Sequence, residues 1–175
     1  MDKLGERLAR GDAAAFAELY DACADRVHHY LTMRLRSRDD ADDVLQETFV
    51  RLVRSLHKLQ RVENLTAYLF TMARNEAMRH CERKSKESTR QIELTADDLF
   101  ATPSSDIQTR EAAEMIVVAL RDLSEEQREV VELKVYGELT FREIGEVMGI
   151  PLATAATRYR TALERLKDWL ARQLS

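Results

Sequence analysis

Five side chains near the C-terminus have types and spacing suited to reading double-stranded DNA. They follow one another at intervals of 3, 1, 3 and 4 residues, so they share one face of a helix: Thr154, Thr157, Arg158, Thr161 and Arg165. Arginine can donate to guanine edges or phosphates, and threonine can contact phosphate or the thymine methyl group. A solvated face normally mixes Glu with Arg, whereas Glu164 and Asp168 lie off this stripe. The pattern favours DNA binding over an ordinary solvent-facing stripe.

A basic block over residues 74–90 could hold single-stranded nucleic acid. It follows a helix-spaced segment that contains Tyr68 and Phe70, and it includes Arg74, Asn75, Arg79, Arg83, Lys84 and Lys86. Cations can bind phosphates while aromatic rings stack on bases. A solvated basic helix end, favoured by the helix dipole, explains the same composition equally well.

An acidic segment could bind a basic protein helix. Its polar residues can form one exposed edge of a helix: Asp42, Asp43, Gln46 and Glu47. We expect the opposite side to be apolar, with Leu45, Phe49 and Leu52. Such an edge suits an Arg-rich partner, although acids at a helix start can also simply complement its dipole. The run 39–43 lacks the spacing of a calcium loop, so we expect no metal there.

The sequence has no arrangement typical of an enzyme. It contains no Gly-rich phosphate loop and no Ser/His/Asp set with supporting spacing. The pairs His28-His29 and His80-Cys81 are adjacent, which is not the i, i+4 spacing of helical metal ligands. Cys23 and Cys81 are expected to be reduced, structural thiols. We therefore expect no catalytic residue, metal, cofactor or small-molecule substrate.

These residues must be positioned by helices. The 175 residues include only 5 Gly and 2 Pro, which predicts an all-α fold. Apolar residues at helical spacing form stripes, and each stripe predicts an amphipathic helix. The first stripes contain Phe16 to Tyr20, Val27 to Leu35, Val44 to Leu56, and Leu65 to Ala73. Breaks are expected at residues 36–40 and 60–64.

Helix-end signals are explicit in the C-terminal part. Residues 124–127 (SEEQ) and 140–143 (TFRE) form capping boxes, and Gly137 and Gly149 are expected to end the helices that follow them. After Pro151 a long helix should run to about residue 174. A short helix, a turn and a long helix make a helix-turn-helix, whose second helix enters the major groove. Its inner face is expected to be Ala155, Tyr159, Ala162, Leu163, Leu166, Trp169 and Leu170.

We predict two small helical domains joined by a flexible linker. Residues 1–86 form the first, 87–107 the linker and 108–175 the second; the linker is polar and contains a Pro-Ser-Ser break. The net charge of −4 is unevenly distributed, because residues 51–90 carry a net charge of +6. A localised basic block can bind phosphate although the whole chain is acidic.

Several motifs resemble, in order, those of the extracytoplasmic-function (ECF) sigma factors of bacterial RNA polymerase. They are residues 11–20 (GDAAAFAELY), 39–52 (DDADDVLQETFVRL), 64–75 (NLTAYLFTMARN) and the stretch from Leu123 to Leu170. The resemblance covers nearly the whole chain outside the linker. It implies a sigma factor that directs RNA polymerase to specific promoters.

The resemblance also implies residue roles. The residues that the resemblance implies for docking on the β′ clamp coiled coil of core RNA polymerase are Asp42, Asp43, Leu45, Gln46, Glu47 and Phe49. At the −10 element, where a base is flipped from the non-template strand, the resemblance points to Asn75. The basic block and its neighbouring ring add Tyr68, Arg74, Arg79, Arg83 and Lys84 as expected contacts. For the −35 duplex the resemblance points to Thr154, Thr157 and Arg158. We expect further contacts from Thr140, Arg142, Arg160, Thr161 and Arg165.

Further partners follow from the same resemblance. They are the β flap of the polymerase, promoter DNA and an anti-sigma factor that clamps the two lobes, and the linker would run toward the RNA exit channel. Ala153, Ala156 and Thr161 depart from residues frequent in the family, as do Tyr68 and Val53. These departures bear on the −35 contacts rather than on the fold.

Two other functions fit parts of the sequence. A stand-alone helix-turn-helix regulator needs only the second lobe, and a helical adaptor would need no DNA contact. The acidic segment and the basic block distinguish a sigma factor from both. No apolar run reaches the ~20 residues that cross a bilayer, and the acidic N-terminus is unlike a secretory signal, so we expect a cytoplasmic protein without membrane insertion.

Overall fold

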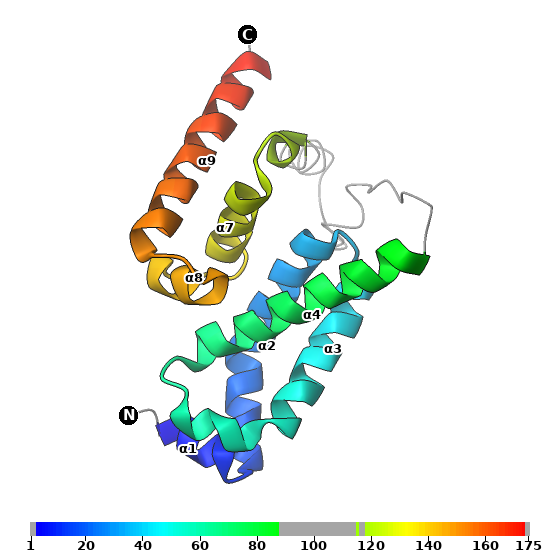
Figure 1. Cartoon of the computed structure of the whole chain (residues 1–175), viewed down its shortest axis with the longest axis vertical. Helices are drawn as coiled ribbons and strands as arrows, with labels where there is room; N and C mark the ends of the chain where they lie inside the picture. Colours follow the sequence, from blue (N-terminus) through cyan, green and yellow to red (C-terminus); the bar gives the residue numbers. More distant parts are fainter. Residues whose placement is uncertain (1–2, 88–114, 116–117, 174–175) are drawn as a thin grey trace.

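The computed structural model describes residues 3–87, 115 and 118–173, and within these ranges all regular structure is helical (Figure 1). The predicted all-α fold is confirmed. In chain order the helices are α1 (Lys3–Ala9), α2 (Ala13–Leu35), α3 (Arg38–Arg54), the 3-10 helix η1 (Leu56–Arg61), α4 (Leu65–Glu87), α7 (Glu125–Val135), α8 (Phe141–Met148) and α9 (Leu152–Gln173). The predicted linker lies mostly outside the described residues.

Helix α2 carries the first two apolar stripes of the sequence. Two separate helices were the prediction, and that prediction is wrong, because residues 13–35 contain no Gly or Pro that would end a helix. The side chain of Asp12 caps the start by accepting from the amides of Ala14 and Ala15 at 2.9 and 3.3 Å. The helix ends where Arg36 adopts a left-handed conformation with φ of 55°.

Helix α3 begins inside the acidic run. Ser37 caps it, with its hydroxyl accepting from the Asp40 amide at 3.2 Å, and Asp39 and Asp40 lie in the first turn. Acids at this end complement the helix dipole, which accounts for part of the run without any metal. Helices α2, α3 and α4 bury an apolar core between them, including Val27, Leu31, Val44, Leu52 and Leu69.

The C-terminal helices begin and end as predicted. Both capping boxes are present, at Ser124 with Gln127 and at Thr140 with Glu143. Gly149 ends α8 with φ of 66°, a conformation that glycine adopts without steric cost. A Cβ on Gly145 would lie 2.7 Å from the Ile150 carbonyl oxygen, so glycine allows the close turn between α8 and α9. The helix-turn-helix is therefore formed.

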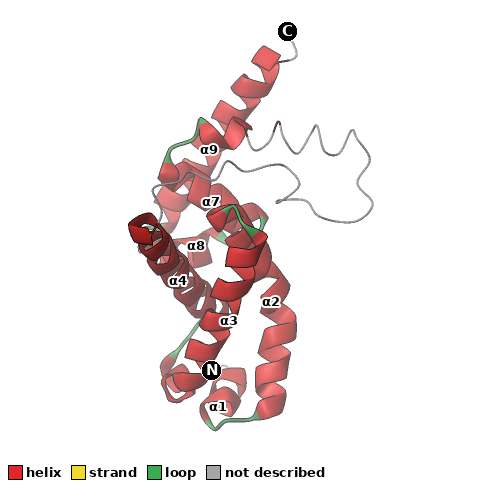
Figure 2. Cartoon of the chain, turned by 90° about the vertical axis from the view of Figure 1, so that its right-hand side faces the viewer, coloured by secondary structure: helices red, strands yellow, loops and turns green. Residues whose placement is uncertain are grey.

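The two lobes pack directly against each other. Helix α7 lies beside α2, and α8 lies against α4, as both views of the chain show (Figures 1 and 2). Tyr30 and Phe70 from the first lobe belong to the same buried cluster as Val130, Leu133 and Ile144 from the second. The sequence predicted the lobes but not this shared core.

A glycine lies where the two lobes pack tightly against each other. A Cβ on Gly137 would lie 2.9 Å from the Phe70 ring and 2.6 Å from the Leu133 carbonyl oxygen. The Gly137 carbonyl accepts two hydrogen bonds from Arg26, at 2.7 and 3.0 Å. The arginine also lies over the Phe70 ring, 5.8 Å from its centroid. The end of α7 is thus held by α2 and α4.

The inner face of α9 is shorter than predicted. Ala155 and Ala162 are buried, but Leu163 and Leu170 are 44% and 42% exposed, so their assignment to the core is wrong. With a rise of 1.5 Å per residue, α9 is about 33 Å long and α7 about 16 Å. Helix α7 therefore cannot cover the whole length of α9, whose C-terminal end projects beyond it in Figure 1. Among the described helices, none is long and apolar enough to span a membrane.

Candidate nucleic-acid interface

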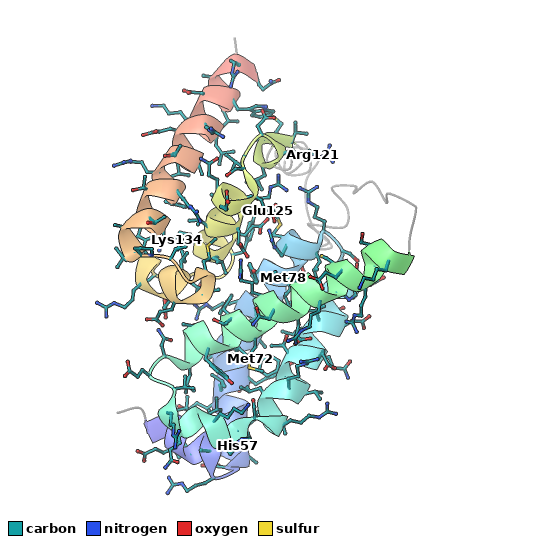
Figure 3. The ribbon with its side chains drawn as sticks, in the orientation of Figure 1. His57, Met72, Met78, Arg121, Glu125 and Lys134 are labelled. Atoms are coloured by element: carbon teal, nitrogen blue, oxygen red, sulfur yellow. The ribbon has the colours of Figure 1, made fainter. Side chains whose placement is uncertain are left out.

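A hollow of about 450 Å³ lies along α4, where it faces the end of α3 and η1. Three of the residues predicted to bind single-stranded DNA line it: Tyr68, Asn75 and Arg79. They are 7 and 4 residues apart, so they share one face of α4 with Met72, which is labelled in Figure 3. We call this hollow, with all its lining residues, the α4 cavity.

The α4 cavity is strongly basic because α3 and η1 add cations that the sequence reasoning missed. Its wall includes Arg51, Arg54 and Lys58, opposite Arg79. The signal was the basic segment that starts at residue 51, whose first cations are spaced 3 and 4 residues apart. Together with an aromatic ring and an exposed amide, these cations can hold one nucleotide with its phosphates.

Two predicted cations of the basic block lie on other faces of α4. Lys84 forms an ion pair with Asp40, whose other oxygen lies 3.1 Å from Nε2 of His80. Burial alone would raise the pKa of Asp40, but Lys84 and His80 hold it below its usual value. Arg74 points to α7, whereas Arg83 is exposed further along the helix. The predicted cations of the block therefore lie in four environments, which are the α4 cavity, the pair with Asp40, the contact with α7 and the exposed surface.

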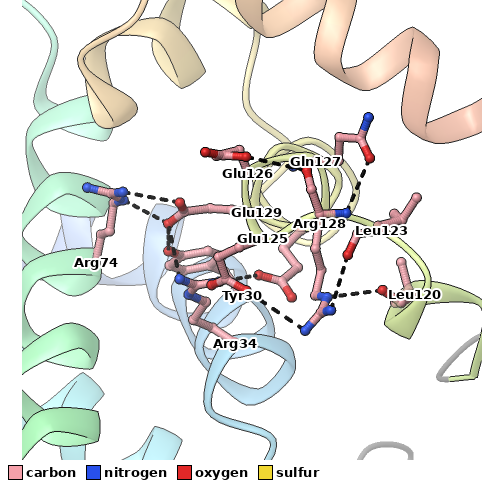
Figure 4. A network of polar contacts seen from close by, with 12 residues as sticks. Tyr30, Arg34, Arg74, Leu120, Leu123, Glu125, Glu126, Gln127, Arg128 and Glu129 are labelled. Atoms are coloured by element: carbon pink, nitrogen blue, oxygen red, sulfur yellow. Dashed lines mark hydrogen bonds and ion pairs between the residues drawn. The ribbon is translucent and has the colours of Figure 1, made fainter.

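Arg74 takes part in a polar network between the lobes (Figure 4). It donates from Nε and Nη2 to the two carboxylate oxygens of Glu129, at 2.7 and 3.1 Å. The hydroxyl of Tyr30 donates to the same carboxylate at 3.4 Å, and burial raises the pKa of that phenol well above its usual value. Arg34 forms ion pairs with Glu125, Glu129 and Glu132.

Glu132 is the most perturbed acid of this network. It is 2% exposed, and its Oε2 lacks a hydrogen-bond partner, with Arg34 Nη1 3.7 Å away. Burial raises the pKa of Glu132 to about 7, and the nearby Arg34 offsets only part of that effect. The lobe interface therefore contains a carboxyl group that titrates near neutral pH.

The predicted duplex-reading residues of α9 are partly exposed and partly half-buried. Thr157, Arg160 and Arg165 are exposed, and Thr154, Arg158 and Thr161 are half-buried. Arg165 donates to the Gln127 side chain at 3.1 Å. At the start of α8, Arg142 is exposed, while the exposed Thr140 uses its hydroxyl to cap the helix. The stripe is not packed inside the protein, so it remains available to a ligand.

The acidic edge of α3 borders an apolar hollow of about 480 Å³. Asp43 and Gln46 are exposed, and Glu47 pairs with Arg51 at 3.1 Å. Asp42, 62% exposed, lies 2.8 Å from Nε2 of His28. The hollow is lined by Phe16, Tyr20, Asp42, Leu45, Gln46, Phe49, Val50, Val53 and Arg54.

One prediction for this edge is wrong. Leu45 and Phe49 were expected opposite the acidic residues, but they line the hollow beside Asp42 and Gln46. Positions 42, 45, 46 and 49 are 3 or 4 residues apart, so they share one face of the helix. Leu52 is buried on the inner side as predicted. The surface therefore offers apolar area next to negative charge.

Comparisons with known proteins cover both lobes. Family models match residues 19–87 as "Sigma-70 region 2" and residues 119–168 as "Sigma-70, region 4". The ECF RNA polymerase sigma factor SigK of Mycobacterium tuberculosis H37Rv is 28% identical, over 97% of this chain and 93% of that protein. SigW of Bacillus subtilis is 24% identical over 94% of each chain.

Two solved structures share the fold. CnrH, solved in complex with the cytosolic domain of CnrY, has a TM-score of 0.71 and 20% identity, over 97% of this chain and 96% of that chain. RpoE of Bartonella quintana, solved with the anti-sigma factor NepR, has a TM-score of 0.70 and 23% identity, over 89% of this chain and 96% of that chain.

Proposed function

The chain belongs to the ECF sigma factors, and from this membership we propose how its surfaces divide the work of promoter recognition. Sigma factors direct RNA polymerase to promoters, and this is the function of the chain. They are DNA-binding initiation factors rather than enzymes. A stand-alone helix-turn-helix regulator is not favoured, because the match to region 2 accounts for the first lobe as well.

The proposed −10 site is the α4 cavity, and the main support for this proposal is the set of residues that line the cavity. Tyr68 offers a ring for stacking, Asn75 an exposed amide for a base edge, and the surrounding arginines bind phosphate. Unstacking a base costs a few kcal/mol, which such contacts must offset. Lys84 and Arg83 would meet the backbone further along α4. Arg74 could join them only if its pair with Glu129 breaks.

The proposed −35 site is the duplex-reading stripe of α9, together with the start of α8. Thr154, Thr157 and Arg158 lie in its first turns, which is the part of a recognition helix that meets base edges. Arg160 and Arg165 would bind phosphates on either side, with Thr161 between them. Arg142 and Thr140 at the start of α8 would contact the DNA backbone, as first helices of this motif do.

The proposed docking surface for core polymerase combines Asp42, Asp43, Gln46 and Glu47 with the apolar hollow. Carboxylates guide a basic helix by charge, and the hollow provides the apolar area that stabilises the complex. The β′ clamp coiled coil is the proposed partner here, and the β flap is the proposed partner of the second lobe.

Three further points stay proposals. An anti-sigma factor is one, supported by the relatives solved with CnrY and NepR. A cytoplasmic location is another, because RNA polymerase works there. The third is the division of the chain at residues 86/87 and 107/108, since residues 88–114 lie outside the described part.

The −10 proposal is tested with Asn75→Ala in holoenzyme made with core RNA polymerase. Sequencing transcript starts after overproduction of the chain first supplies a promoter. We expect Asn75→Ala to impair transcription from the duplex promoter, and a template pre-melted at the −10 element to restore most of it. Arg172→Ala, an exposed cation at the far end of α9, is the control. Equal loss on both templates would reject the base-flipping role.

A further inference from the structure

Glu76 is a buried acid in the wall of the basic α4 cavity. It is 4% exposed, and it lies between the cavity residues Asn75 and Arg79 in the sequence of α4. An acid at this place weakens the attraction of the cavity for phosphate, because its charge opposes that of the arginines. Affinity for the DNA backbone therefore does not explain why an acid lies at this position.

The contacts of Glu76 suggest a different role. A single carboxylate oxygen, Oε1, forms ion pairs with Arg79 one turn along α4 and with Nε of Arg51 on α3, the latter at 2.9 Å. Arg51 is also held by Glu47 at 3.1 Å. Two guanidinium groups from different helices are thus fixed at one point of the cavity wall. Both still contribute to the lining of the cavity.

Fixing these arginines has a physical consequence for recognition. A free arginine side chain has several rotatable bonds, and ordering it on binding costs entropy. An arginine that already has one geometry presents its remaining N–H donors in set directions. Set donor directions distinguish one base edge from another, whereas mobile cations attract every nucleotide alike.

We propose that Glu76 is a positioning residue, which holds Arg51 and Arg79 so that the cavity discriminates between bases. This inference rests on the proposed −10 function of the cavity. Glu76 itself, being buried and paired with both arginines, acts through them. A role restricted to joining α3 and α4 would affect stability but not the choice of base.

The test compares Glu76→Gln with Glu82→Gln in the holoenzyme. Gln keeps the shape of the side chain and one acceptor oxygen but loses the charge that fixes the arginines. Glu82 is an exposed acid on the same helix, so its substitution makes the same change in net charge outside the cavity. The probe is fork DNA from the mapped promoter, with each of the four bases placed in turn at every single-stranded −10 position.

For Glu76→Gln we expect the affinity ratio between the best and worst base to fall about tenfold. Binding to DNA of unrelated sequence should stay equal or become tighter, because a negative charge has been removed from the cavity. Glu82→Gln should keep the wild-type ratio. The midpoint of urea unfolding, measured for both variants, shows whether Glu76→Gln remains folded. Glu76→Ala removes all side-chain contacts of this residue and is measured in the same way for comparison.

An unchanged base ratio in Glu76→Gln would overturn the proposal. So would a ratio that falls only in Glu76→Ala and in proportion to its loss of stability. If the proposed −10 function is wrong, the wild-type holoenzyme itself will prefer no base at any position. In that case the proposed role of Glu76 is rejected as well.

Discussion

Arg74 on α4 and Glu129 on α7 form a two-point ion pair that joins the lobes, with distances of 2.7 and 3.1 Å. The Glu129 side chain is only 4% exposed, and Tyr30 and Arg34 on α2 also approach it. One carboxylate from the second lobe is therefore surrounded by groups from two helices of the first. Glu129 is thus paired with Arg74, which the sequence predicted to bind DNA.

Removing Glu129 should weaken the packed arrangement. Glu129→Ala leaves Arg74 and Arg34 with fewer partners in a largely buried interface, so we expect the free energy of unfolding to drop by about 3 kcal/mol. Urea unfolding measures this. Glu126→Ala, an exposed acid on the same helix, should change the value by less than about 0.5 kcal/mol. Equal losses in the two variants would contradict an energetic role for the pair.

Glu132 should make stability depend on pH. Its pKa is about 7 in the folded protein and near 4.5 when unfolded, so between these values the folded state binds more protons. The proton on Glu132 therefore favours the folded state. This stabilisation is fully present below pH 4.5 and is lost as the pH rises through 7. The loss is on the order of 3 kcal/mol.

The variant Glu132→Gln checks this assignment. A neutral amide removes the titration, so stability measured by urea unfolding should vary less between pH 5 and 8 than in the wild type. At pH 8 the variant should be the more stable of the two, because no buried charge must be maintained. If both proteins respond to pH in the same way, another group is responsible.

The acidic edge of α3 should be needed for binding to core polymerase. Asp43 is exposed, so Asp43→Arg should leave the fold intact and weaken binding about tenfold through charge reversal. Fluorescence titration of labelled chain with core polymerase provides the affinity. Asp25→Arg reverses an exposed acid on α2, away from the hollow, and should bind like the wild type. Wild-type affinity of Asp43→Arg would reject the docking surface.

The duplex-reading stripe of α9 should determine duplex binding. Arg158→Ala removes a phosphate or guanine contact, so we expect holoenzyme affinity for the −35 duplex to fall about tenfold. The slope of log affinity against log salt should also decrease by about 1 if the contact is to phosphate. Filter binding at several salt concentrations measures both. Arg172→Ala near the end of the same helix is the control, and promoter occupancy unaffected by Arg158→Ala would argue against this face.

Much of the molecule follows from local sequence. Capping boxes at Ser124 and Thr140, the left-handed Gly149 and the acid-free stripe on α9 depend on residues within a few positions of one another. The all-α fold, the helix-turn-helix and the membership in the ECF sigma factors could therefore be predicted from the sequence. The spacing of Tyr68, Asn75 and Arg79 is also local, although these residues were not predicted to share one face of α4.

Only the tertiary structure decided what each helix face meets. In the structure Arg74 pairs with Glu129, and Lys84 pairs with Asp40. Arg51 and Lys58 line the α4 cavity, whereas Leu163 and Leu170 remain exposed. Arg74 and Glu129 are 55 residues apart. Spacing within a helix determines which side chains share a face, but the neighbour of that face depends on how separate segments pack, and no local pattern encodes that packing.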